Sequence, residues 1–264
     1  MLEPLPVIRP RQRGPSIHGR DLPASTAFSW LGAGWRDLKT SPWSSLGHGL
    51  ALVMLSYAIL AFLWATDMHY LALPAISGFL IIGPFFAIGL YEKSRRLEEK
   101  GTPDPVSDLE RNRSPAVQIA FAGLLLGLLV LFWLRAADLL YALYFGIHPF
   151  PGAEDAMVNV FTTDRGWALL VVGTLVGGLF AAFAFALSLF SIPMMVAENR
   201  DALTAMGLSF ALTARNLGPC FLWGVIVVAG LMISVATGLL GFIVIFPLLG
   251  HGTWHAWRAI GAET

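Results

Sequence analysis

The stretch GFLIIGPFFAIGLY, residues 78–91, is followed closely by Arg95 and has a counterpart near the C-terminus. Both copies are apolar runs with an early glycine, a central proline, a second glycine, an aromatic residue and an arginine. The paired positions are Gly78 and Gly241, Phe79 and Phe242, Ile82 and Ile245, Pro84 and Pro247, Gly89 and Gly252, Tyr91 and Trp254, and Arg95 and Arg258. In a bilayer the apolar run faces lipid, small residues admit a neighbouring helix, and the arginine stays in water. The repeated stretch therefore predicts a membrane protein.

Composition supports this prediction along the whole chain. Of the 264 residues, 56% are hydrophobic and only 13% are charged, and the mean hydropathy is +0.68. A soluble domain of this length carries more charge. The formal net charge is zero, so nothing predicts a nucleic-acid partner, and we expect the lipid bilayer itself as the main partner. Cys220 is the single cysteine, which excludes an internal disulfide, and we interpret it as a packing residue.

The first residues, 1–24, differ from the rest of the chain. They mix prolines with four arginines and contain no apolar core. A cleaved signal peptide needs a hydrophobic segment behind its basic end, so this region does not fit one. We interpret residues 1–24 as a disordered cytoplasmic tail and residues 25–260 as the membrane domain.

Six apolar runs are long enough, or nearly so, to cross about 30 Å of hydrocarbon at about 1.5 Å per helical residue. They are approximately Leu46–Thr66, Leu71–Tyr91, Ala116–Leu134, Val171–Ala197, Pro219–Thr237 and Leu239–Trp257. With six crossings, fifteen of the 17 Lys and Arg residues fall on the side that holds the N-terminus, and only Arg135 and Arg165 fall on the other. This asymmetry predicts that both termini are cytoplasmic.

The six runs form three pairs, and each pair follows a short segment that ends before a proline. The preceding segments contain Trp30, Leu31, Trp35 and Leu38; Ser107 and Glu110; and Leu203, Met206 and Phe210. We interpret each as an amphipathic helix in the cytoplasmic interface. The predicted fold is thus an all-α membrane protein with six transmembrane helices as three helical hairpins, each preceded by a short amphipathic interfacial helix. The hairpin repeats span about residues 27–96, 107–200 and 201–260.

Prolines and glycines inside the runs predict how the hairpins pack. The second run of each pair carries a proline, namely Pro84, Pro193 and Pro247. A proline removes a backbone hydrogen bond and bends the helix, so neighbouring helices or serines such as Ser191 must approach it. The middle pair adds two small-residue spacings that favour close contact between its helices. These are Gly123 with Gly127, and Gly173 with Gly177.

Three segments resemble a known family. The ending FPLLGHGTWHAWR, residues 246–258, is similar to the C-terminal signature of the bacterial DUF2189 family of predicted integral membrane proteins. Residues 34–38, GWRDL, and 83–92, GPFFAIGLYE, resemble its N-terminal pattern. The resemblance extends over about Trp30 to Arg258, and it implies a bacterial inner-membrane protein without an established activity.

Three histidines are the candidate ligand-binding residues. His251 and His255 are four residues apart on one face of the sixth run, and His48 lies at a similar depth at the start of the first. Neutral imidazoles at that spacing can converge on a haem or a metal ion. Alternatively, they hydrogen-bond to lipid headgroups or to neighbouring helices. We expect the second use, and hence no cofactor, because the spacing places no carboxylate, cysteine or third ligand beside them.

Other absences from the sequence narrow the function. No charged residue falls near the centre of any expected span, although proton-coupled transporters usually need one there. A phosphate-binding loop, a G-x-S-x-G elbow and an H-E-x-x-H helix are also missing, so an enzyme is unsupported. We therefore expect a non-enzymatic accessory or scaffold component that associates with other membrane-protein subunits. A carrier or channel for a small solute, and a haem- or metal-binding protein, are the alternatives.

Overall fold

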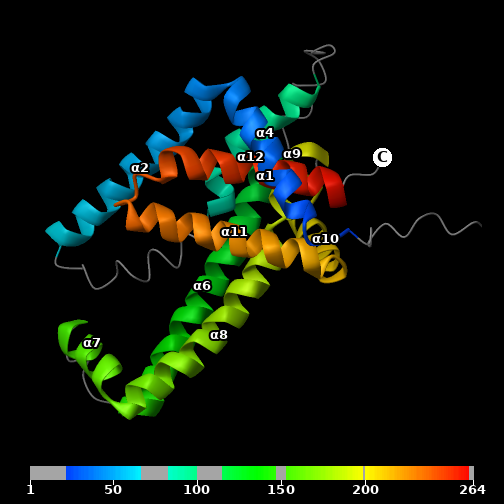
Figure 1. Cartoon of the computed structure of the whole chain (residues 1–264). Coiled ribbons are helices and arrows are strands. Elements are labelled where there is room, and N and C mark those ends of the chain that lie inside the picture. Colours follow the sequence, from blue (N-terminus) through cyan, green and yellow to red (C-terminus); the bar gives the residue numbers. More distant parts are fainter. Residues whose placement is uncertain (1–21, 67–82, 100–114, 147–152, 199, 262–264) are drawn as a thin grey trace, which may run out of the picture.

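The computed structural model describes residues 22–66, 83–99, 115–146, 153–198 and 200–261. Within these ranges every regular element is a helix (Figure 1). The helices are α1 (Thr26–Thr40), α2 (Pro42–Ala65), α4 (Ile88–Glu98), α6 (Pro115–Phe145), α7 (Ala153–Thr162), α8 (Asp164–Ser188), α9 (Ser191–Glu198), α10 (Ala202–Arg215), α11 (Leu217–Ala236) and α12 (Phe242–Ile260). The all-α prediction is confirmed. Almost all of the predicted tail, residues 1–21, and the predicted capping box at Ser107 and Glu110 lie outside the described residues.

Within the described ranges, four helices are long and apolar enough to cross a membrane: Pro42–Ala65, Ala116–Phe145, Asp164–Glu198 and Leu217–Ala236. They coincide with the first, third, fourth and fifth predicted spans. Most of the second predicted span, residues 71–82, lies outside the described residues. The sixth corresponds to α12, which is helical but buries a polar C-terminal half and is not among the four. Four membrane-capable helices are thus found where six were predicted.

Helix α1 packs along α12. Its buried residues are Ala27, Trp30, Ala33, Gly34 and Leu38, which recur every three or four positions and so share one face. A Cβ atom on Gly34 would lie 2.6 Å from the carbonyl oxygen of Leu248, so the two backbones approach as closely as glycine allows. The apolar residues of this predicted amphipathic helix therefore lie on different faces. Trp30 and Leu38 face protein, whereas Trp35 remains exposed beneath the Lys39 ammonium.

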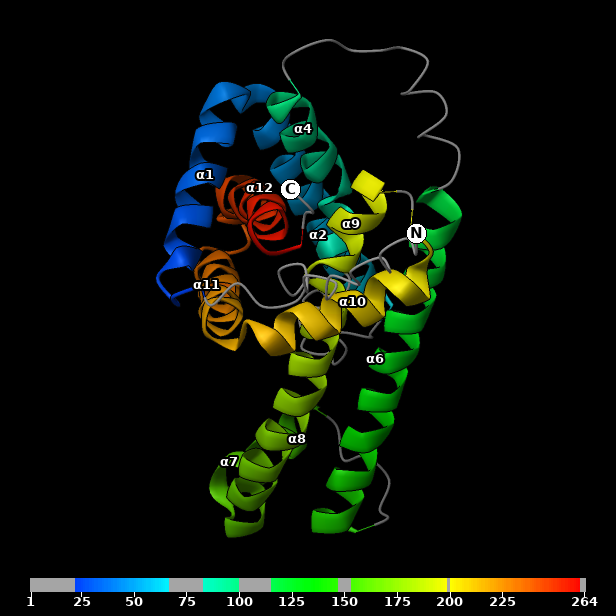
Figure 2. The same ribbon diagram turned by 90° about the vertical axis from the view of Figure 1, so that its right-hand side faces the viewer.

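The helices α4, α9 and α12 contact one another, and α10 lies across α8 and α9 (Figure 2). Bulky side chains fill this region, among them the almost inaccessible Leu90, Phe190, Met195 and Trp254. We call the assembly of α1, α4, α9 and α12 together with the first turns of α2 the closed end. The helices of this region carry or follow the three prolines.

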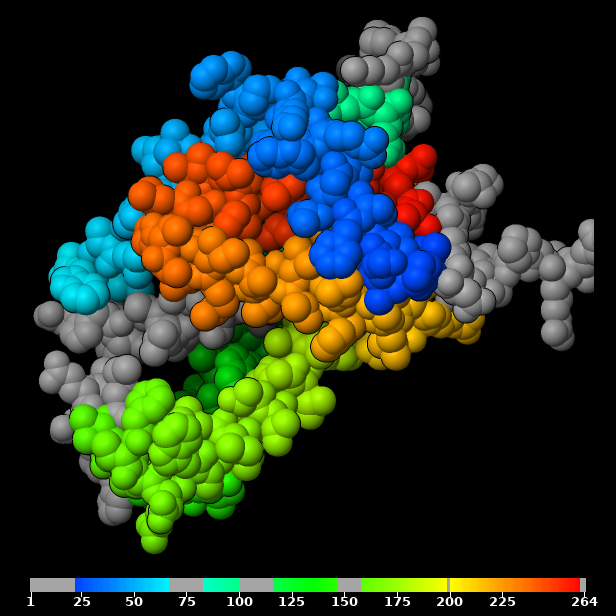
Figure 3. Space-filling view, in the orientation of Figure 1, coloured from blue at the N-terminus to red at the C-terminus, as the bar shows by residue number. Residues whose placement is uncertain are grey.

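Helices α6 and α8 pack side by side and project from the closed end as a pair that we call the arm (Figures 1 and 2). Helix α7 contacts α8 beyond a tight corner at Thr163. The Thr163 side chain caps α8 by accepting a hydrogen bond from the Gly166 amide at 3.0 Å. The surface is hollowed between the arm and α11 (Figure 3).

Candidate functional site

A polar network lies inside the closed end, where α1, α2, α4 and α12 meet. Its members are Asp37, Ser45, Lys93, Ser94, Glu98, His251 and His255. Ser45, Ser94 and His251 are fully buried. The Nε2 atom of His251 lies 3.0 Å from Ser45 Oγ, and its Nδ1 atom lies 2.6 Å from Ser94 Oγ. One imidazole thus joins α12 to both α2 and α4.

Hydrogen-bond accounting fixes the protonation of His251. Ser94 donates its only hydroxyl proton to Asp37 Oδ2 at 2.7 Å, so it must accept from His251 Nδ1. At the other side, Lys93 Nζ donates to Ser45 Oγ at 2.9 Å, which leaves the Ser45 proton for His251 Nε2. His251 is therefore neutral, with its proton on Nδ1. All donors point the same way, from the Lys93 cation to the Asp37 carboxylate.

Asp37 closes the network on α1. Its Oδ2 atom also lies 2.9 Å from His255 Nε2. Burial raises the pKa of Asp37, but the hydrogen bonds from His255 and Ser94 outweigh this effect and leave the pKa below its ordinary value. The other ring nitrogen of His255, Nδ1, lies 3.5 Å from Glu98, which also pairs with Arg258. Asp37 is thus held ionised between α1, α4 and α12.

Lys93 links the start of the network to the end of α1. Besides Ser45, it donates to the carbonyl oxygen of Ser41 at 3.1 Å, the residue that ends α1. Partial burial lowers the pKa of Lys93. The same carbonyl oxygen also accepts from the Ser45 amide at 3.2 Å, so Lys93 adds a second hydrogen bond at the corner where α1 ends and α2 begins.

The third candidate histidine, His48, lies apart from this network. Its Nδ1 atom bonds the carbonyl oxygen of Ser44, one turn earlier on the same helix, at 2.9 Å. Its ring lies against Gly89, where a Cβ atom would come within 2.5 Å of Nε2. Among the described residues no group of three or more His, Cys, Asp and Glu side chains is placed to hold a metal ion. Ligand binding by His251, His255 and His48 stays a prediction.

The network contains a nucleophile and a base but no room for a substrate. Ser45 and His251 have the hydrogen-bonding relation of a serine nucleophile and its base. Both side chains are wholly inaccessible, and the two cavities described below are lined by other residues. What this arrangement does is tie four helices together.

Pro193 marks a break between α8 and α9, and a serine from another helix repairs it. Ser209 of α10 donates to the Ala186 carbonyl oxygen at 2.7 Å and accepts from the Phe190 amide at 3.0 Å. Its hydroxyl therefore occupies the place of the helical bond between those two backbone groups. A neighbouring serine was expected at this proline. Ser209 fills that role, while Ser191 makes only a longer bond of 3.4 Å within its own turn.

One of the other two prolines borders a small cavity. Pro247 lies inside α12, and Pro84 lies in the helical turn that precedes α4. A space of about 100 Å³ is lined by Pro84 and, from α12, by Phe246 and Gly250 among others. The volume per molecule in liquid water is about 30 Å³, so this space holds a few waters at most.

The four glycines of the middle pair have different surroundings. A Cβ atom on Gly177 would lie 2.8 Å from the Trp133 ring of α6, and one on Gly123 would lie 3.2 Å from Phe85. Gly127 and Gly173 have open space at that position. The arm helices do pack together, but through Trp133 over Gly177 and not through four interlocking glycines.

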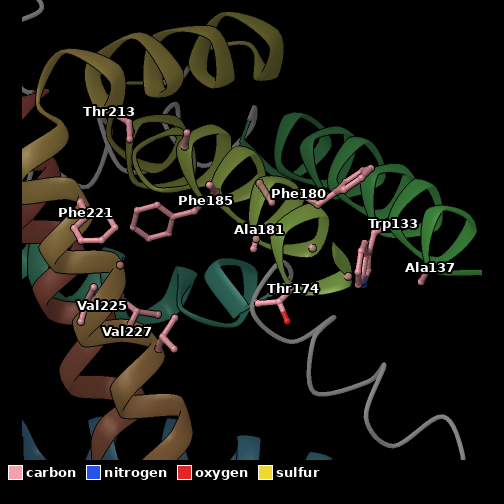
Figure 4. A pocket seen from close by; sticks show the side chains of 18 of the residues that line it. Trp133, Ala137, Thr174, Phe180, Ala181, Phe185, Thr213, Phe221, Val225 and Val227 are labelled. Carbon is pink, nitrogen blue, oxygen red and sulfur yellow. The ribbon is translucent and has the colours of Figure 1, made fainter. Parts of the chain in front are cut away.

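A larger apolar groove of about 1160 Å³ lies between the arm and α10–α11 (Figure 4). Aromatic rings stand along it, with Phe185 of α8 opposite Phe221 of α11 and Trp133 of α6 at its far end. Gly173 and Gly178 lie on its floor along α8. No charged side chain is among the described residues that line it. The groove thus suits an apolar occupant.

Comparison with protein families identifies the central part of the chain. Residues 71–197 match the DUF2189 family. The family is described as a predicted integral membrane protein. No curated protein and no solved structure matches the chain. The resemblance seen at residues 83–92 is confirmed, whereas residues 34–38 and 246–258 lie outside the matched range.

The DUF2189 match covers α4, the arm and α9 but divides the polar network. Lys93, Ser94 and Glu98 lie within it, whereas their partners on α1, α2 and α12 lie outside. Sequence reasoning found His251 and His255 but missed Ser45, Ser94 and Asp37. No spacing could have found them, because the network joins residues as far apart as Asp37 and His255.

Proposed function

We propose that this integral membrane protein is a non-enzymatic accessory or scaffold component that binds a transmembrane helix of another membrane protein. We place it in the bacterial inner membrane with both termini cytoplasmic, on the strength of the charge asymmetry in the sequence. In this topology residues 71–91 and α12 complete three hairpins, which gives six crossings.

The exposure of the arm is the observation that carries the proposal. We compare how much of the apolar 18-residue segment of each helix is buried within the chain. The buried share is 6% for α8–α9 and 11% for α6, compared with 33% for α11. The arm helices pack along each other, but they are long and apolar and few of their residues are buried within the chain. Such helices have most of their surface available to lipid or to other helices.

One face of α6 has the spacing of a helix–helix seam. Its exposed residues Val117, Phe121, Leu124, Leu128 and Leu131 alternate steps of four and three. This alternation averages 3.5 residues, the repeat that keeps one face of a helix against a partner helix. On α8 the exposed residues Trp167, Val171, Leu175, Leu179 and Phe183 recur every four positions instead. We therefore assign the partner to α6 and lipid to that face of α8.

The alternative functions have less support from the geometry. A carrier needs a path between the proline-bearing helices, where the described cavity measures about 100 Å³. A haem or metal site at His251 would have to replace its bonds to Ser45 and Ser94. An absorption spectrum and metal analysis of the purified protein test that proposal directly, since a Soret band or stoichiometric metal would establish it.

Affinity purification in mild detergent tests the scaffold proposal. The wild type should recover a stoichiometric membrane-protein partner. Replacing Leu124 and Leu128 with alanine should lower the recovery at least tenfold, because both contacts lie at the centre of the seam. The matched control replaces Leu175 and Leu179 of α8 and should leave recovery unchanged. Recovery of the chain alone, or solute flux through liposomes containing only this protein, would overturn the proposal.

A further inference from the structure

Thr213 presents a buried hydroxyl without a strong partner at one end of the groove. The residue is 7% exposed, and its Oγ1 atom makes no hydrogen bond to nitrogen or oxygen within the described part of the chain. The Cys220 thiol beside it is only a weak hydrogen-bonding partner. The Thr213 side chain points from α10 toward the rings of Phe185 and Phe221 (Figure 4). A buried hydroxyl with so weak a partner costs free energy, so its position favours a further bonding partner from outside the chain.

The rest of the groove is suited to a hydrocarbon chain. It follows α8 from Leu169 to Ala186, and its opposite wall is formed by α11 from Leu217 to Ala229. Its volume of about 1160 Å³ slightly exceeds that of most ligand pockets, which measure about 300–1,000 Å³. Since no charge lines it, a ligand must present a neutral group to Thr213.

The depth of Thr213 selects the kind of ligand. Thr213 lies in the last turn of α10, and the membrane-capable helix α11 begins at Leu217. The hydroxyl is thus level with the boundary between the hydrocarbon layer and the headgroups, where lipid ester carbonyls lie. Arg215, exposed in the same turn, supplies a cation on the headgroup side.

We propose that the groove binds one phospholipid, with an acyl chain between α8 and α11 and an ester carbonyl accepting a hydrogen bond from Thr213 Oγ1. The geometry favours a lipid over a docked helix because the groove is apolar along its length and has a polar group, Thr213, at the headgroup boundary. This site is separate from the exposed face of α6, so either proposal can fail without the other.

Native mass spectrometry of the protein purified in mild detergent and reloaded with phosphatidylethanolamine tests the site. The wild type should retain one phospholipid. Thr213→Val should lower its occupancy about three- to tenfold through loss of one hydrogen bond, and Thr213→Ser should restore it. Thr213→Val should not lower the unfolding temperature of the lipid-free protein, because it removes a hydroxyl whose partner within the chain is only a weakly bonding thiol.

A second variant tests the apolar part of the groove independently of Thr213. Gly178 faces open space within the groove, so Gly178→Leu fills the groove without displacing protein atoms and should abolish retention. Two controls should bind as the wild type does: Gly127→Leu, also in open space but outside the groove, and Thr174→Val, at its far end. Loading with free palmitate distinguishes the ester from a carboxylate and should give weaker retention. Equal lipid retention in the wild type, Thr213→Val and Gly178→Leu would overturn the proposal, as would a second protein chain in place of the lipid.

Discussion

The closed end and the arm differ in composition and solve different problems. In the closed end, small residues let α1 reach the backbone of α12, and seven polar side chains bond to one another across four helices. The arm helices are more uniformly apolar, with an exposed ion pair between Arg135 and Asp138 and with few residues buried within the chain. The two regions therefore differ both in polar content and in how far the chain itself covers them.

Buried polar groups are tolerated in this chain where their hydrogen bonds are satisfied. A buried hydroxyl or imidazole is costly unless its bonding capacity is filled. At the closed end every member of the network has a partner, so the network adds specificity to the packing. We expect substitutions there to destabilise the protein, and matched substitutions in the arm to leave stability unchanged. Cys220, the single buried cysteine, reports unfolding through its reaction with a thiol-specific dye.

The largest loss of stability is expected for His251→Leu. The substitution keeps the apolar volume but removes the bonds to Ser45 and Ser94 at two buried sites, at a cost of about 2–4 kcal/mol. His48→Leu removes only a bond to its own helix and should cost less than about 1 kcal/mol. Thermal unfolding in detergent checks both. Equal losses would show that His251 is not the centre of the network.

Next is Gly34→Ala, which tests the contact between α1 and α12. The added methyl group would press against the α12 backbone, so we expect a loss of about 1–3 kcal/mol despite the better helix propensity of alanine. Gly32, on the same helix, and Gly127, in the arm, have open space at this position. Alanine at either should be neutral or slightly stabilising. Loss of stability at Gly32 or Gly127 would contradict the distinction between the two regions.

Ser209→Ala tests the repair of the break at Pro193. Without the hydroxyl, the Ala186 carbonyl and the Phe190 amide lose their bonds in a buried setting, at a cost of about 1–2 kcal/mol. Ser191→Ala makes the same chemical change nearby but removes only the weaker 3.4 Å bond. The same unfolding assay ranks the pair, and the account requires the Ser209 variant to be the less stable one.

Asp37→Asn should have the smallest effect of the four and should depend on pH. The folded-state pKa of Asp37 lies below the ordinary aspartate value of 3.8, so its charge stabilises the fold above that pH and this contribution is lost as the pH falls through the folded-state pKa. The variant should be about 1 kcal/mol less stable at pH 7, with the difference shrinking below about pH 4. Asp138→Asn, in the exposed pair of the arm, should change stability by less than about 0.5 kcal/mol at any pH. A pH-independent deficit for Asp37→Asn would show that its charge is not what matters.

Local patterns in the sequence predicted much of the fold and little of the site. Runs of apolar residues located α2, α6, α8 and α11, because membrane-crossing helices must be long and uniformly apolar. The proline at position 193 predicted a bend that a serine repairs, but the serine is Ser209, not Ser191, since tertiary packing selects the partner. The histidines at 251 and 255 stood out by spacing. Ser45, Ser94 and Thr213 did not, because a serine or threonine in an apolar run is ordinary until its neighbours are known.

Photo-crosslinking from single positions of the arm in intact membranes tests the central claim most directly. A photoreactive residue at Leu128, on the evenly spaced face of α6, should attach to one defined membrane protein. The same residue at Leu175 of α8 should attach to lipid alone. Protein adducts of equal yield from both positions, or from neither, would contradict the claim that the protein acts through a helix-binding arm.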